Sequence, residues 1–124
     1  MNCGDSISVL VGPQKMMKLN NEHTPKNEIE RKNLDAKGAI VLEKKKILRV
    51  LGELAVSRSF GDKNYKDYIT AEPEVLKFDI DEDYDYLVMA TDGFWNVHYF
   101  LFFEIFESCS LFLKFGYLFY WIIR

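Results

Sequence analysis

The chain of 124 residues contains few cysteines and no closely spaced cysteine pair. Cys3 and Cys109 are the only two, so the sequence supports neither a disulfide framework nor a zinc site. The stretch from Asn2 to Ser8 is mostly polar and lacks the apolar core of a secretory leader. We therefore expect a reducing compartment, which is the cytoplasm or the nucleus.

A strong charge imbalance and long apolar runs are also absent. The formal net charge is −3 and 48% of the residues are hydrophobic, which argues against a disordered chain and against nucleic-acid binding. The longest uncharged run near the C-terminus covers residues 115–123. It is short beside the ~20 residues of a membrane-spanning helix.

Residues 98–124 form an apolar tail that differs in composition from the rest of the chain. They hold 11 of the 19 aromatic residues. Three interpretations remain open: a membrane anchor, a helix that enters a core, or translation across an intron, since Phe, Tyr, Ile, Leu and Lys codons are rich in A and T. Glu104, Glu107 and Lys114 disfavour the anchor, because charges inside a span are costly.

The spacing of apolar residues predicts several strands and one short helix. Apolar residues alternate over 7–11, and a turn at Gly12-Pro13 leads to a returning strand over 16–19. Asn27 is suited to cap a helix over 27–37 that ends at Gly38. The apolar stripe of this helix is weak, which indicates a surface helix with solvated charges. Further strands are expected over 39–42, 47–50, 75–80 and 87–90, with charged turns over 43–46 and 79–85.

An acidic residue follows the most apolar of these strands. Residues 87–90 are Leu, Val, Met and Ala, and Thr91-Asp92-Gly93 comes directly after them. A carboxylate at the end of a buried strand is costly unless it has a partner, and a divalent cation is one such partner. A simple Asp-Gly turn is the other interpretation.

Four segments follow one another in a fixed order along the chain. They read NCGDS (2–6), LGELAVSRSFGD (51–62), AEPEV (71–75) and YLVMATDGFWNV (86–97). In this order they resemble the metal-dependent protein phosphatases of type 2C, which are specific for phosphoserine and phosphothreonine. The resemblance spans residues 2–97 and implies a partial domain over 1–97, with a tail over 98–124 that does not match. It implies an α+β fold, part of an αββα sandwich of antiparallel sheets.

The resemblance also implies the chemistry. The family hydrolyses phosphoserine and phosphothreonine in protein substrates with water activated by two Mg²⁺ or Mn²⁺ ions. Asp92 matches one of the metal-binding carboxylates, and Asp5 matches the acidic residue at an additional metal position. The resemblance assigns no catalytic or phosphate-binding residue within this chain.

Most of the family's metal ligands have no counterpart in this sequence. The Asp-Gly-His-Gly motif, the upstream acidic pair with its phosphate-binding arginine, and the Gly-x-x-Asp-Asn motif are all absent. Asn96 stands where the family has an aspartate after Trp95. We therefore expect a protein serine/threonine phosphatase in truncated form, inactive alone. The alternative is a non-catalytic binding module, tethered to a membrane by residues 98–124.

Other polar residues near these motifs are given structural roles. A Gly-Asp-Ser turn in which the Asp5 side chain bonds to backbone is the alternative to a metal role. Arg58 is expected to bind phosphate or, more simply, to pair with Asp62. His23 has no second histidine or cysteine nearby, which argues against a metal site.

Overall fold

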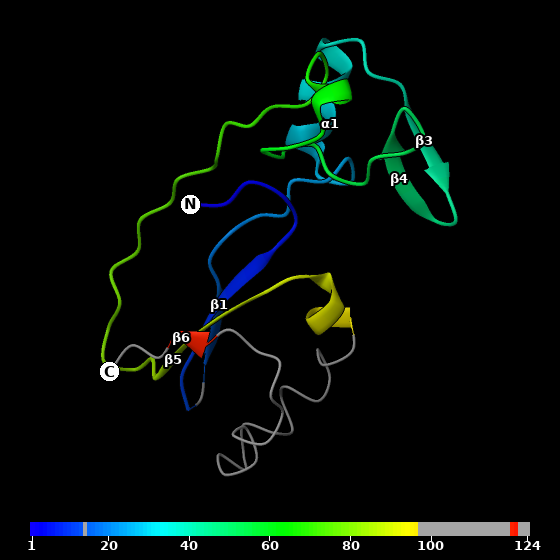
Figure 1. Ribbon diagram of the computed structural model, residues 1–124. Helices are drawn as coiled ribbons and strands as arrows, with labels where there is room; N and C mark the ends of the chain where they lie inside the picture. The colour runs from blue at the N-terminus through cyan, green and yellow to red at the C-terminus, as the bar shows by residue number, and fades with distance from the viewer. Residues whose placement is uncertain (14, 97–119, 122–124) are drawn as a thin grey trace. The chain divides into compact units, whose positions relative to one another are not determined.

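The computed structural model describes residues 1–13, 15–96 and 120–121 (Figure 1). These residues divide into two compact units. The first contains Met1–Asp5 and Asn21–Leu76, and the second contains Ser6–Asn20 and the described residues from Lys77 onward. The expected α+β class with antiparallel sheets is confirmed in the described residues.

The second unit is built on an antiparallel sheet in the order β2-β1-β5-β6 (Figure 1). Strand β1 pairs with β5 so that Ile7 faces Ala90, Val9 faces Val88 and Val11 faces Tyr86. Because side chains alternate along a strand, these six residues share one face of the sheet. The strands are β1 (Ile7–Val11), β2 (Met16–Lys18), β5 (Tyr86–Ala90) and β6 (Tyr120–Trp121).

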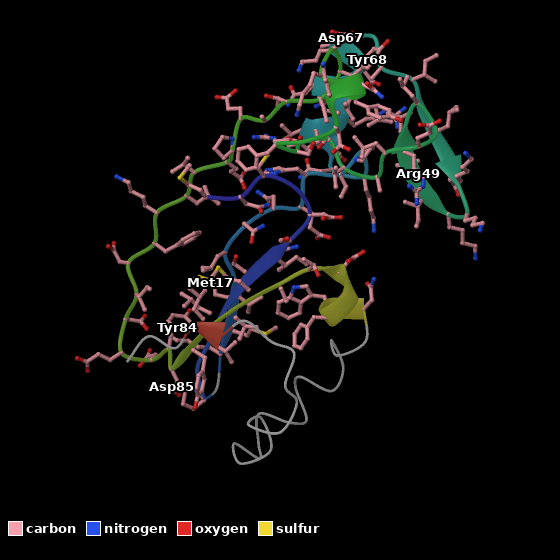
Figure 2. All side chains as sticks on the ribbon, in the orientation of Figure 1. Met17, Arg49, Asp67, Tyr68, Tyr84 and Asp85 are labelled. Carbon is pink, nitrogen blue, oxygen red and sulfur yellow. The ribbon has the colours of Figure 1, made fainter. Side chains whose placement is uncertain are left out.

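Lys15 anchors the acidic turn that precedes β5. Its ammonium group bonds the carboxylates of Asp81, at 3.2 Å, and Asp83, at 2.8 Å, and lies 4.2 Å from the centre of the Tyr84 ring. The Tyr84 hydroxyl donates to Met17 Sδ at 3.9 Å (Figure 2). The turn is exposed, as predicted, and it is tied to the β1–β2 hairpin by charge.

The first unit packs a helix, α1 (Glu28–Ala36), against a hairpin of β3 (Val41–Lys44) and β4 (Ile47–Val50). A single 3₁₀ turn, η1, covers Lys63–Tyr65. This unit has one small cluster of buried apolar residues. Its members are Leu34, Ala39, Val50 and Ile69.

Both ends of α1 are closed by the residues that the sequence indicates. The Asn27 side chain accepts from the backbone N–H of Ile29 at 2.9 Å and of Glu30 at 3.4 Å. At the other end Gly38 has φ 73°, and backbone bonds run from Gly38 to Asp35 and from Ala39 to Leu34. These two bonds define a Schellman motif, in which glycine takes the left-handed position. The predicted helix and both caps are confirmed.

The strand predicted over 75–80 is wrong. The structure has no strand there, and Val75, Leu76, Phe78 and Ile80 are all exposed. The alternation of apolar residues is real, but a strand also needs a neighbour for its backbone groups. Among the described residues, Glu74 has such a neighbour, through an isolated bridge to Asn2, but it lies just before this segment.

None of the helices in the described part of the chain is long and apolar enough to cross a membrane. The tail predicted over 98–124 lies outside the described residues, apart from the backbone of β6. The domain boundary predicted at residue 97 lies outside them as well.

The β3–β4 hairpin turns through two lysines with left-handed backbone. Lys45 has φ 53° and Lys46 has φ 65°, the signs that a type I′ turn requires. Side chains with a Cβ atom disfavour this region, and Asn-Gly is the preferred pair. We predict that the double variant Lys45→Asn/Lys46→Gly stabilises the hairpin by about 1 kcal/mol.

Amide hydrogen exchange over residues 41–50 measures this change directly. The matched control is Lys45→Gln/Lys46→Gln, which removes the same two charges and keeps both Cβ atoms. Equal slowing of exchange in both double variants would attribute the effect to charge and not to backbone conformation.

Candidate functional site

Asp92 stands immediately beyond β5, at the start of a helical turn. The backbone is helical over 92–96, and the Thr91 carbonyl accepts from Phe94 N–H at 3.1 Å and Trp95 N–H at 3.3 Å. Asp92 itself is exposed, and its carboxylate accepts no hydrogen bond from the described residues.

Trp95 holds this turn against the sheet. Its indole N–H donates to the carbonyl of Ala90 at 2.9 Å, and its ring packs beside Val9, Val11 and Val88 with only 6% of its surface exposed. The ring also meets Phe94 edge-on, with centroids 5.0 Å apart. The backbone at Asp92 is thus fixed by packing, while its carboxylate has no hydrogen-bond partner in the described residues. This is the combination that a rigid metal ligand needs.

Asp5 belongs to the first unit, where it follows Gly4. Gly4 has φ 128°, a conformation that residues with a Cβ atom rarely adopt. Asp5 is half-buried, and its carboxylate also lacks a hydrogen-bond partner in the described part of the chain. The alternative in which the Asp5 side chain bonds to backbone is therefore not observed there.

Carboxylate oxygens are the ligands that Mg²⁺ and Mn²⁺ prefer, so each aspartate fits the role of a single metal ligand. They lie in different units. Across the described residues, no group of three or more His, Cys, Asp or Glu side chains is arranged to hold a metal ion. The described residues therefore offer isolated carboxylates and not a complete metal-binding cage.

A buried ionic network, absent from the sequence predictions, occupies the first unit. Glu30 is only 3% exposed, and its carboxylate binds the Arg58 guanidinium in a bidentate fashion at 2.6 and 3.1 Å. The Ser57 hydroxyl donates to the same carboxylate at 2.6 Å. Arg58 also donates to the carbonyl of Glu72 at 3.1 Å. The network joins α1 to the two loops that carry the second and third sequence motifs.

Two predictions are corrected by this network. Arg58 pairs with Glu30 and not with Asp62, whose carboxylate instead accepts from the Ser59 hydroxyl at 2.6 Å. The charges of α1 are not all solvated. The inward face of α1 runs through Glu30 and Leu34, four residues apart, whereas Ile29 is 67% exposed. An acidic residue four positions before a leucine was the only signal of this arrangement.

The pKa of Glu30 reflects two opposing effects. Burial alone would raise the pKa of its carboxyl, because it disfavours the charged form. The hydrogen bonds from Arg58 and Ser57, together with the Arg58 charge, outweigh burial and bring the pKa below its ordinary value of 4.5. Glu30 is therefore ionised at neutral pH, and the ion pair is fully formed.

This lowered pKa makes the stability of the first unit depend on pH. The contribution of Glu30 is fully present above about pH 4.5 and is lost as the pH falls through the lower pKa of the folded protein. We predict that Glu30→Gln costs about 3–5 kcal/mol at pH 7, because Arg58 keeps a buried charge without its partner. It should also flatten the acid part of the stability profile.

Urea denaturation between pH 7 and pH 3 measures both effects. Glu28→Gln is the matched control, since Glu28 lies on the exposed side of the same helix. A loss of stability equal to that of the control would show that the pair makes no net contribution.

Comparison with solved structures identifies the class of protein to which this fold belongs. A phosphatase from a pathogenic strain of Toxoplasma gondii superposes with a TM-score of 0.72 at 26% identity, covering 91% of this chain and 39% of that chain. A sex-determining protein of C. elegans superposes with a TM-score of 0.73 at 27% identity, covering 77% of this chain and 23% of that chain. The fold of this chain therefore resembles part of the fold of a phosphatase.

Sequence comparison defines the family. The model of protein phosphatase 2C matches residues 1–99, and the chain belongs to this family. Its relatives include probable protein phosphatase 2C 55 of Oryza sativa subsp. japonica, 44% identical, and protein phosphatase 2C 3 of Arabidopsis thaliana, 42% identical, each over 96 residues. The resemblance stated from four motifs is confirmed.

The aligned region is a small part of these relatives. It covers 77% of this chain but 25% of the rice protein and 22% of the Arabidopsis protein. The chain thus spans about a quarter of the length of the curated relatives it matches.

Proposed function

We propose that this chain is a portion of the catalytic domain of a metal-dependent protein serine/threonine phosphatase. The observation that carries the proposal is the match to protein phosphatase 2C over residues 1–99, which includes the strand end at Asp92. The substrates are phosphoserine and phosphothreonine side chains of proteins. The described sheets and helix form part of the αββα sandwich of a complete domain.

Asp92 contributes one carboxylate ligand to a divalent cation, Mg²⁺ or Mn²⁺, and Asp5 contributes one to an additional cation. When bound, such cations lower the pKa of water and offset negative charge on the phosphoryl oxygens. The role of β5 and Trp95 is to hold the Asp92 backbone in place before the cation arrives, so that little ordering remains to be done on binding.

The chain alone supplies too few ligands for this chemistry. The acidic motifs that complete the family's site are missing from its sequence. We predict that the 124-residue chain shows no manganese-dependent hydrolysis of a phosphothreonine peptide above the buffer rate. Phosphate release over a series of Mn²⁺ concentrations measures this. Turnover by the chain that is lost in Asp92→Asn would contradict the prediction and make the chain an enzyme as it stands.

The function of Asp92 can be tested in a chimera. The 96 residues of the rice protein that align with this chain are replaced by those of this chain, which restores the missing motifs from the relative. We predict that the chimera is an active phosphatase and that Asp92→Asn lowers its activity by about 100-fold or more. Stability without metal should change by less than about 0.5 kcal/mol, because the Asp92 carboxylate is exposed and unbonded.

Asp85 provides the matched control for this test. It is an exposed aspartate just before β5, at the opposite end of the strand from Asp92 (Figure 2). Asp85→Asn removes the same charge and should leave activity unchanged. Equal losses in the two variants would refute a specific metal role for Asp92, and an inactive parent chimera would count against the proposed function itself.

A further inference from the structure

Two hydrogen bonds join His23 to the backbone of Gly4. The Gly4 N–H donates to Nδ1 of His23 at 3.2 Å, and the backbone N–H of His23 donates to the Gly4 carbonyl at 3.0 Å. The His23 side chain is 1% exposed. His23 therefore bonds to both polar groups of the Gly4 backbone, and the Gly4 carbonyl also accepts from Nδ2 of Asn2 at 3.0 Å.

The first of these bonds determines where the ring carries its proton. A backbone N–H can only donate, so Nδ1 of His23 must be the unprotonated nitrogen. In the neutral ring the proton then lies on Nε2. This nitrogen has no hydrogen-bond partner in the described residues, and its nearest acidic atom, Oε2 of Glu74, is 3.8 Å away. That distance is too long for a hydrogen bond.

An unpartnered buried donor is unfavourable for folding, and an apolar side chain would avoid it. A histidine at this position is therefore explained if its other nitrogen, Nδ1, makes an interaction that offsets this cost. That nitrogen does one thing in the described structure, which is to accept from Gly4. The benefit is the placement of Gly4.

Further backbone hydrogen bonds fix the chain around Gly4 and His23. Asn2 and Glu74 exchange two backbone hydrogen bonds, at 2.9 and 2.8 Å, which fixes the chain just before Gly4. The carbonyl of His23 accepts from Ser57 N–H at 2.8 Å, which connects His23 to the Glu30–Arg58 network. The next residue after Gly4 is Asp5, whose carboxylate accepts no hydrogen bond from the described residues. The backbone is thus fixed as far as Gly4, and the side chain of the next residue, Asp5, has no hydrogen-bond partner in the described residues.

We infer that His23 is a positioning residue, whose Nδ1 fixes Gly4 and thereby places the Asp5 carboxylate for a divalent cation. The inference rests on the ligand role of Asp5 within the proposed function. It assigns His23 no contact with the cation, because its ring acts only through the Gly4 backbone.

Two substitutions separate this role from simple packing. In His23→Asn the side-chain oxygen lies close to the former position of Nδ1 and still accepts from Gly4. In His23→Gln the amide reaches toward the former position of Nε2, and the acceptor for Gly4 is lost. Both variants remove the ring, so a packing role would affect them alike.

The first measurement is hydrogen exchange of the Gly4 amide in the full 124-residue chain, followed by NMR. We expect exchange at least tenfold faster in His23→Gln than in the wild type, and within threefold of the wild type in His23→Asn. The nitrogen shifts of the wild-type ring should show Nδ1 unprotonated and Nε2 protonated. The same exchange rate in both variants would overturn the inference.

The second measurement is a Mn²⁺ titration of the same chain, read as paramagnetic broadening of the Asp5 and Ser6 amide signals. Asp5→Asn should abolish the broadening, and His23→Gln should require at least threefold more Mn²⁺ than the wild type or His23→Asn. Broadening that persists in Asp5→Asn, or that is unaltered in His23→Gln, would overturn the inference. Neither result depends on the activity of the Asp92 chimera, so the two proposals fail separately.

Discussion

The first unit depends on one buried ion pair, between Glu30 and Arg58. Its apolar core cluster contains four buried residues, which is little to hold a helix, a hairpin and several loops together. The bidentate pair supplies directional bonds that a small core cannot, because a guanidinium and a carboxylate meet in one plane. Ser57, Glu72 and His23 are connected to that pair by hydrogen bonds. The loops that carry the sequence motifs are thus held together through α1.

The second unit fixes its aspartate by a different means. There the turn at Asp92 is held by the Trp95 ring, which packs on the valines of β1 and β5 and bonds back to Ala90. The two mechanisms give the same result. In each unit the backbone beside an aspartate is fixed, and the carboxylate itself has no partner in the described residues. Hydrogen bonds and packing fix the backbone in both units and do not involve the two carboxylates in the described part of the chain.

Local features were predictable from the sequence, and non-local partners were not. The caps at Asn27 and Gly38, the β1–β2 hairpin and the strand before Asp92 follow from spacing and turn chemistry, which involve neighbouring residues. The other hairpin was predicted with a displaced first strand, because β3 covers Val41–Lys44 and not 39–42. The partner of Arg58 did not follow, because Glu30 is 28 residues away and acidic side chains closer in sequence were equally plausible. The strand over 75–80 failed for the same reason, since pairing depends on a neighbour that the local pattern does not reveal.

The candidate site was predictable only as far as single residues. Asp92 and Asp5 were predicted as metal ligands because they lie within recognisable motifs, and the structure leaves both carboxylates without hydrogen-bond partners in its described part. The contribution of His23 was not visible, because it acts through the ring nitrogen that accepts from Gly4. A lone histidine in a sequence carries no information about which of its nitrogens is in use.

The register of β1 against β5 has a consequence for how this family can vary. Ile7 faces Ala90 and Val11 faces Tyr86, and this pairing decides for each side chain between them on which of the two faces of the sheet it lies. Replacing one apolar residue by another keeps the assignment. Inserting or deleting a single residue in β5 would reverse it for the rest of the strand, removing Val88 from the core or rotating the turn after Ala90. Strand β5 can therefore accept substitutions between apolar residues, whereas an insertion or deletion within it disrupts the packing of the sheet.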